Sequence, residues 1–173
     1  MGSTIALALY QLRPDLPRTL ILTAGYAGWA GSLPPQEVAD RLRTSLHDLD
    51  TVGSPEAFVR TWVPSLFTSD ADPAVVEDYV KVMAGFHDGG VRQMLYAIAG
   101  ADLRPVLPTI EVPTLLLYGA EDARAPLPVA EAMHREIRGS ELVVLPGAGH
   151  MSNLEAPDRF NAVVQGFLDG NSD

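Results

Sequence analysis

Two short apolar runs, residues 114–118 and 141–145, dominate the hydrophobic pattern of the second half of the chain. Continuous apolar runs of this length, bounded by proline and glycine, are typical of strands buried in a parallel sheet. A helical pattern over residues 128–137 separates the two runs, so the sequence predicts a strand–helix–strand unit with parallel strands. An earlier run, residues 19–24, ends at Gly25 and predicts a third strand of the same kind.

Helical patterns lie near both ends of the chain. Residues 5–12 are apolar on nearly every side and stop before Pro14, which predicts a buried helix that needs a sheet and neighbouring helices to cover it. The last helix is expected from Pro157 to Gly170, because its apolar residues recur at helical spacing. Those residues are Phe160, Val163, Val164, Phe167 and Leu168.

The middle of the chain has helical patterns and no strand pattern. Three short helices are expected there, because serine and aspartate cap helices and proline suits the first helical turn. Their expected openings are Pro34-Pro35, Ser54-Pro55 and Asp72-Pro73. Helices inserted between two strands of one sheet indicate a cap over the carboxyl edge of that sheet.

A pair of glycines, Gly89 and Gly90, should end this helical region, and a further helix should run from Val91 towards Leu107. We therefore expect a helical cap over residues 34–89. The core would consist of residues 1–33 and 90–173.

A polar residue follows each strand of the strand–helix–strand unit. Asp122 lies in the glycine-containing turn after the first strand, and His150 lies in the corresponding turn after the second. Because parallel strands end at the same edge of a sheet, an acid and an imidazole should meet where open α/β folds keep their sites. The order acid then histidine is that of the last two members of a Ser-Asp-His triad.

The composition narrows the class of protein. With 173 residues, 47% of them hydrophobic and 20% charged, the chain suffices for one ordered domain with a real core. A net charge of -10 argues against a nucleic-acid surface. The absence of cysteine excludes disulfides, thiolate metal sites and a cysteine nucleophile. No basic residue precedes the apolar residues 5–9 and no run could span a membrane, so we expect a cytoplasmic protein without a signal peptide.

Two longer motifs carry a family resemblance: VPTLLLYGAED at residues 112–122 and GAGHMSNLEAP at residues 147–157. The chain resembles the C-terminal part of a cap-bearing α/β-hydrolase, the type that includes bacterial esterases, lactone hydrolases and cofactor-free haloperoxidase-like enzymes. The resemblance covers essentially the whole chain. It implies a partial α/β-hydrolase fold, with three parallel C-terminal strands, flanking helices and a helical cap, and it implies no cofactor and no metal.

The resemblance also implies that the nucleophile is missing. In this family the serine sits in an elbow, G-x-S-x-G, that leads directly into a buried helix. Residues 1–7 are similar to the second half of that elbow, which places the serine one residue before Met1. The backbone N–H of Met1 would then be one donor of the oxyanion hole. The chain by itself should be inactive.

Three explanations of this start are open: an internal methionine taken as a start codon, a split or decayed gene, and a vector scar on a cloned fragment. We favour the first, because the fit of Met1 and Gly2 to the elbow would be a coincidence if residues 1–3 were a scar. None of the three supplies the serine.

Within the resemblance, His150 is the base that takes the proton of the serine, and Asp122 orients the ring and stabilises the imidazolium. Gly147 and Gly149 would let the loop bring the ring to the sheet edge. The alternative interpretations are an ordinary loop histidine and a turn or cap aspartate. Glu121 is a competing acid, but the family spacing favours Asp122.

Ser3 and Thr4 are possible replacement nucleophiles, but both should lie at a helix start, where capping or packing is the commoner role. Ser152 and Asn153 are expected to shape the loop around His150. Three further histidines have no ligand spacing, so no metal site is expected. They are His47, His87 and His134.

Trp62 is the candidate for an apolar substrate pocket under the cap. Aromatic residues at helical spacing more often belong to the core, so both interpretations stay open. Trp29, Phe67, Tyr79 and Phe86 are weaker candidates for the same pocket.

Two classes of function follow. The first is a hydrolase of an ester, lactone or related acyl compound, uncharged and partly hydrophobic, by a Ser-His-Asp mechanism; an aspartate in place of the serine would make it a dehalogenase. The second is a non-catalytic fragment, or a subunit that completes a site with a separate N-terminal half. Without the strand that precedes the nucleophile elbow in the complete fold, the strand at residues 19–24 would have an unpaired edge. We therefore expect exposed apolar surface, and self-association unless a partner covers it. Neither nucleic acid nor membrane is an expected partner.

Overall fold

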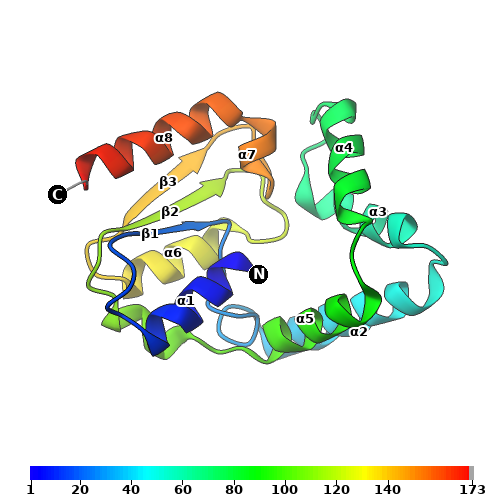
Figure 1. Ribbon diagram of the computed structural model, residues 1–173, viewed down its shortest axis with the longest axis horizontal. Coiled ribbons are helices and arrows are strands. Elements are labelled where there is room, and N and C mark those ends of the chain that lie inside the picture. Colours follow the sequence, from blue (N-terminus) through cyan, green and yellow to red (C-terminus); the bar gives the residue numbers. More distant parts are fainter. Residues whose placement is uncertain (172–173) are drawn as a thin grey trace.

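The computed structural model describes residues 1–171, and a three-stranded sheet lies at its centre (Figure 1). The strands are β1 (Leu20–Thr23), β2 (Thr114–Gly119) and β3 (Glu141–Leu145), in the order β1-β2-β3. Both neighbouring pairs are parallel. The three predicted strands and their direction are therefore confirmed.

Helices cover both faces of the sheet. In Figure 1, α1 (Gly2–Leu12) and α6 (Leu127–Glu136) lie below it. The short helix α7 (Ser152–Glu155) and the long helix α8 (Pro157–Gly170) lie above it. The structure is thus a layered α/β fold, as predicted.

The central strand β2 is buried throughout and contributes side chains to the core on both faces of the sheet. Leu116 and Tyr118 belong to the large core cluster on the side of α1 and α6. Leu115 and Leu117 pack with Phe167 of α8 on the other side. This alternation explains why the run is apolar at every position, since both faces of a parallel strand must be covered.

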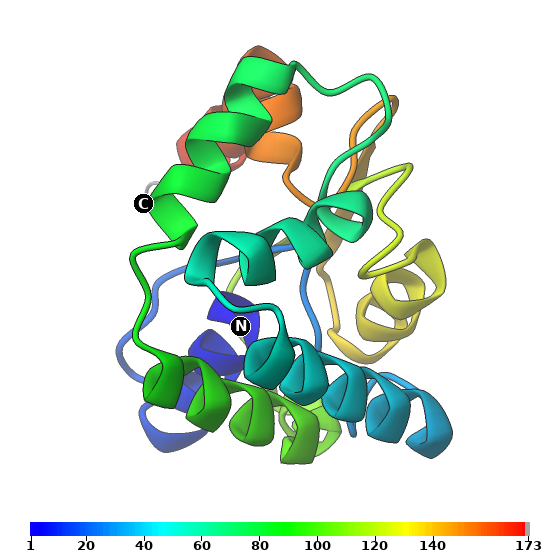
Figure 2. The same ribbon diagram turned by 90° about the vertical axis from the view of Figure 1, so that its right-hand side faces the viewer.

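Four further helices are stacked beyond the carboxyl ends of the strands (Figures 1 and 2). They are α2 (Pro35–Thr51), α3 (Pro55–Leu66), α4 (Pro73–Met83) and α5 (Asp88–Gly100). Figure 2 shows α2 and α5 side by side, with α3 crossing above them. The Ser54 hydroxyl and the Asp72 carboxylate each accept a hydrogen bond from a first-turn N–H, so both predicted caps are confirmed.

Two expectations for the stretch after the third of these helices were wrong. Gly89 and Gly90 do not break the chain but lie in the first turn of α5, where N–H groups need no partner within the helix. The helix then ends at Gly100 and does not reach Leu107. A separate 3-10 helix, Arg104–Thr109, follows, because Pro105 restricts the residue before it and cannot continue an α-helix.

The first helix is buried on one face only, which corrects the expectation of burial on nearly every side. Leu7 and Tyr10 pack against the sheet, whereas Ile5, Leu9 and Leu12 are 60%, 45% and 77% exposed. Beside it, the outer edge of β1 pairs with no other strand among residues 1–171. The expected unpaired edge and exposed apolar surface are both present.

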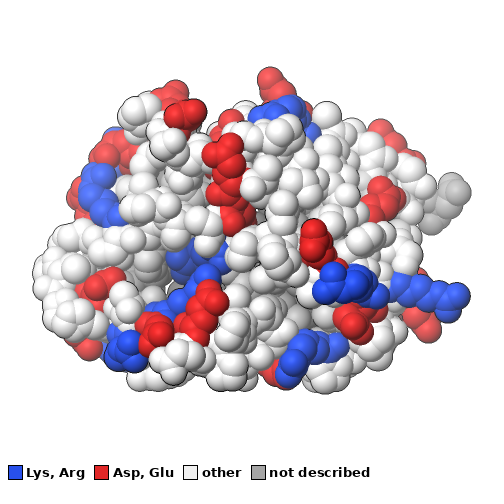
Figure 3. All heavy atoms as spheres, turned by 180° about the vertical axis from the view of Figure 1, so that it is seen from behind, with Lys and Arg blue, Asp and Glu red and all other residues white. Residues whose placement is uncertain are grey.

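Charged side chains are spread over the surface. Figure 3 shows acidic and basic groups interspersed on the rear face, with large uncharged areas between them. No helix within residues 1–171 is long and apolar enough to cross a membrane.

Candidate functional site

The ring of His150 meets the carboxylate of Asp122 at the carboxyl edge of the sheet. His150 Nδ1 lies 2.9 Å from Asp122 Oδ2 and 3.2 Å from Oδ1. An ionised carboxylate only accepts hydrogen bonds, so the contact holds the proton on Nδ1 and leaves Nε2 as an acceptor. Throughout the described chain, the His150 ring has no other hydrogen-bond partner. The structure therefore brings together the two residues that the sequence paired.

Asp122 is fixed by its own turn. Its side chain is fully buried, and Oδ1 accepts hydrogen bonds from the backbone N–H groups of Arg124, at 2.8 Å, and Ala125, at 2.7 Å. A buried carboxylate needs such donors to remain ionised. Glu121, the competing acid, is exposed and does not contact the ring. The turn thus presents one oxygen to the backbone and the other to the histidine.

The two loops that carry these residues are joined through their backbones. The N–H of Glu121 donates to Ala148 O at 2.9 Å, and the N–H of Ala120 donates to Leu145 O at 2.9 Å. Gly119 makes this approach possible, because a Cβ there would lie 2.2 Å from the carbonyl oxygens of Ala148 and Gly149. The sequence had assigned the necessary glycines to the histidine loop alone.

Glu155 fastens the histidine loop to the segment at the end of α3. Its Oε2 accepts from the N–H of Gly149 at 2.8 Å, and its Oε1 accepts from both the N–H and the hydroxyl of Thr68 at 2.7 Å. The N–H of Met151 also donates to Leu66 O at 3.0 Å. Sequence reasoning had given Glu155 no role, since Thr68 lies 87 residues away along the chain.

A cavity of about 170 Å³, the inner cavity, opens beside the His150 ring. Side chains of α3, α4 and α5 and the two loops line it, and most are apolar or aromatic. The lining residues are Met1, Tyr26, Trp29, Trp62, Leu66, Tyr79, Met94, Leu95, Ile98, Arg124, His150 and Met151. A hydrophobic cavity next to a histidine suits an organic substrate.

Three of the predicted aromatic candidates line this cavity: Trp62, Trp29 and Tyr79. Phe67 and Phe86 do not; they form edge contacts with Tyr79 and Phe58, respectively. Met1, the expected oxyanion donor, borders the same cavity as His150.

Ser3 and Thr4, the possible replacement nucleophiles, lie in the first turn of α1. Ser3 Oγ accepts a hydrogen bond from the backbone N–H of Tyr26 at 3.1 Å. Thr4 is buried, and its hydroxyl has no hydrogen-bond partner in the described chain. Neither residue caps its helix, whose N-cap position is Met1. Neither hydroxyl forms a hydrogen bond with His150 in the described chain.

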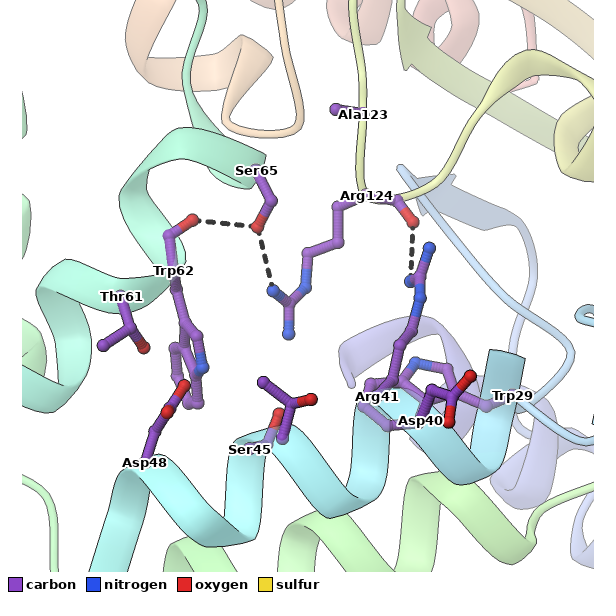
Figure 4. A pocket seen from close by; sticks show the side chains of 11 residues that line it. Trp29, Asp40, Arg41, Ser45, Asp48, Thr61, Trp62, Ser65, Ala123 and Arg124 are labelled. Carbon is purple, nitrogen blue, oxygen red and sulfur yellow. Dashed lines mark hydrogen bonds between the residues drawn. The ribbon is translucent and has the colours of Figure 1, made fainter. Parts of the chain in front are cut away.

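Arg124 is the cavity residue that sequence reasoning missed. Its guanidinium carbon lies 5.4 Å from the centroid of the Trp62 ring, and its Nη1 donates to Ser65 Oγ at 3.2 Å. Figure 4 shows the guanidinium between Trp62 and Arg41. Burial lowers the pKa of Arg124 from its ordinary value. Its position two residues after Asp122 was the only signal, and that position alone does not indicate which way a side chain turns.

The other residues considered at the site have simpler surroundings. Ser152 opens α7 with a buried hydroxyl that lacks a described hydrogen-bond partner, and Asn153 is exposed. Within residues 1–171, no group of three or more histidine, cysteine, aspartate or glutamate residues could hold a metal ion.

Comparisons with known proteins identify the family of the chain. The chain is 30% identical over 172 residues to a pimeloyl-(acyl-carrier protein) methyl ester esterase of Neisseria meningitidis serogroup A, covering 98% of this chain and 55% of the relative. Among solved structures, a thermophilic esterase from Thermogutta terrifontis superposes with a TM-score of 0.85 at 27% identity, over 98% of this chain and 62% of that one. The enol-lactonase from Burkholderia xenovorans LB400 gives 0.83 at 28% identity, over 98% and 63%. The chain thus spans roughly half to two thirds of the length of these proteins.

The model of the alpha/beta hydrolase family matches residues 1–163, which is nearly the whole chain. Together with the parallel sheet and its helical layers, this match shows that the chain belongs to the alpha/beta hydrolase family.

Proposed function

We propose that this chain carries the acid and the base of a serine hydrolase that acts on an ester, lactone or related acyl substrate. The observation that carries the proposal is the contact of 2.9 Å between His150 Nδ1 and the buried Asp122 carboxylate, beside an apolar cavity. Esterases and a lactonase among the similar proteins support the same class of reaction.

In the proposed mechanism, His150 Nε2 removes the proton of a serine hydroxyl as the oxygen attacks the acyl carbon. The imidazolium then donates that proton to the leaving alcohol, and a water molecule repeats the sequence to release the acid. Asp122 orients the ring and stabilises its positive charge. The backbone N–H of Met1 stabilises the oxyanion.

The serine itself is proposed to precede Met1, in a segment outside this chain. Two observations support this. Met1 and His150 border one cavity, and α1 starts on the side of the sheet where the strands end (Figure 1). The helices of residues 34–89 act as the cap in this proposal, and Trp62 of α3 forms part of the substrate pocket.

The test is hydrolysis of p-nitrophenyl butyrate by a protein extended upstream through the elbow serine. His150→Ala should lower kcat by about 10⁴-fold or more, and Asp122→Asn by a comparable factor, because both disable the base. His47→Ala is the matched control, since His47 is an exposed helix residue that does not line the cavity. Full activity of the His150 variant would refute the proposal.

A second candidate function is a subunit that completes the site only with a separate N-terminal half. The observation in its favour is the unpaired edge of β1 beside the exposed apolar residues of α1. Mixing the chain with a separately produced N-terminal half should then restore hydrolysis, with saturation at a defined ratio. An inert mixture of two folded halves would exclude this candidate.

A further inference from the structure

The Arg124 guanidinium is a cation that forms no ion pair within residues 1–171, although the Asp122 carboxylate acts on it through space. Within the described chain it forms one hydrogen bond, to Ser65, and no ion pair with a carboxylate. The arginines that do form ion pairs with Asp or Glu are Arg13, Arg41, Arg43, Arg60, Arg92 and Arg104. Most of those arginines are exposed to solvent. Arg124, which is less exposed and therefore needs an ion pair more, has none among the described residues.

A guanidinium has five N–H donors, and a half-buried charge such as that of Arg124 destabilises the fold unless an opposite charge or hydrogen bonds accompany it. Four of those donors have no described partner. The indole N–H groups of Trp29 and Trp62 are also buried without a hydrogen-bond partner in residues 1–171. Trp29, Trp62 and Arg124 all line the inner cavity, so three side chains with unpaired N–H groups surround the same cavity.

The surroundings indicate on which side of Arg124 an anion would lie. A second cavity of about 350 Å³, the outer cavity, shares Trp29, Trp62 and Arg124 with the inner one (Figure 4). Arg41, Asp40 and Asp48 line the outer cavity. Arg41 is already ion-paired with Glu37, so the two aspartates would oppose an anion there. No Asp or Glu lines the inner cavity, which also holds His150. An anionic group is therefore stabilised on the inner side.

We propose that Arg124 binds a carboxylate of the substrate, so that this site takes acyl esters or lactones that carry a second, ionised carboxyl group. The guanidinium fork matches the two oxygens of a carboxylate. The hydrocarbon part of the substrate lies against Leu66, Met94 and Leu95 of the same cavity. This substrate class rests on the proposed function, which supplies the reactive end, and it replaces the expectation of an uncharged acyl compound.

Binding can be measured without turnover on the 173-residue chain. The chain has two tryptophans, and both line the inner cavity. A Trp29→Phe variant leaves Trp62, which contacts the Arg124 guanidinium, as the only indole. Its fluorescence is titrated with hexanoate and with hexanamide, a neutral molecule of nearly the same shape.

Hexanoate should bind about tenfold more tightly than hexanamide, because a charge-assisted pair replaces a neutral contact. Arg124→Gln should remove that preference. Arg138→Gln is the control, since it removes one positive charge from an exposed residue outside the cavity. Equal affinity for the two ligands in the parent chain, or an unchanged preference in Arg124→Gln, would overturn the proposal.

The N-terminal ammonium of Met1 is a second cation at the inner cavity, and burial lowers its pKa below 8.0. At pH 9 it is neutral while the guanidinium stays charged. The preference for hexanoate should therefore persist at pH 9, and its loss there would assign the anion to Met1 and overturn the proposal. A negative result leaves the acid–base proposal standing, because hydrolysis by His150 variants tests that proposal separately.

Discussion

The helices α8 and α1 have similar apolar patterns but different surroundings. In α8 the apolar stripe lies on the sheet, where Phe167 is buried and Phe160, Val163 and Val164 pack around it. In α1 one face, with Leu7, packs on the sheet. The opposite face, with Ile5, Leu9 and Leu12, is exposed.

This difference shows that an apolar pattern alone does not determine whether both faces of a helix are covered. On the side of β3 and α8 the apolar stripe of the helix is covered, and this side holds the His150–Asp122 pair, although β3, like β1, pairs with only one strand among residues 1–171. The side with β1 and α1 has an open strand edge and an uncovered apolar face. If the two sides also differ in stability, substitutions on the side of β3 and α8 should lower the free energy of unfolding more than substitutions on the side of β1 and α1.

The largest effect is expected from truncating the packed stripe. Phe167→Ala should lower the free energy of unfolding by about 3–5 kcal/mol, because it leaves a cavity between α8 and the sheet. Ile5→Ala, on the exposed face of α1, should change it by less than about 0.5 kcal/mol. Urea denaturation followed by circular dichroism measures both, and equal losses would mean that α1 is covered in solution.

Gly119→Ala tests the close approach of the two site loops. A Cβ at this position would collide with two carbonyl oxygens of the histidine loop, so we expect a loss of about 3 kcal/mol in unfolding free energy. Gly166→Ala on the outer face of α8 has open space and should stabilise by about 0.5–1 kcal/mol. If the two alanine variants behave alike, the loops are not held together as described.

Glu155→Ala tests the attachment of the histidine loop to the segment at the end of α3. It removes three hydrogen bonds to a carboxylate, and the loss should be roughly 2 kcal/mol. Glu131→Ala on the exposed side of α6 is the control and should be near neutral. Hydrogen exchange at Gly149 should rise in the first variant only; unchanged protection there would exclude a clamping role for Glu155.

The smallest effect on stability is expected from the open side. Leu9→Gln combined with Leu12→Gln should change the free energy of unfolding by less than about 0.5 kcal/mol per site. The same double variant should reduce self-association, because it removes exposed apolar surface. Sedimentation velocity measures this, and a monomeric parent chain would contradict the expectation.

Much of the fold was predictable because apolar runs, caps and prolines act locally. The three strands, the caps at Ser54 and Asp72, and the meeting of Asp122 with His150 all followed from such signals. The extent of α5 did not, since a glycine costs little in a first helical turn, although it usually marks a break.

The remainder of the site was not predictable, since it depends on contacts between distant segments. Glu155 binds Thr68, which lies 87 residues away along the chain. Arg124 lies two residues after the acid in sequence, yet its role depends on the position of its guanidinium against Trp62 and on the absence of an ion pair with a carboxylate among the described residues. Neither the Glu155–Thr68 contact nor the surroundings of Arg124 produce a recognisable pattern in the local sequence.

The central claim is that this chain holds an acid and a base but not the nucleophile. The most direct measurement is the turnover of p-nitrophenyl butyrate by the purified 173-residue chain, beside its His150→Ala variant and the form extended through the elbow serine. The account predicts an inert short chain and turnover that depends on His150 in the extended form alone. Turnover by the short chain that disappears in the His150→Ala variant would contradict the account, and Ser3 would then be the first hydroxyl to replace.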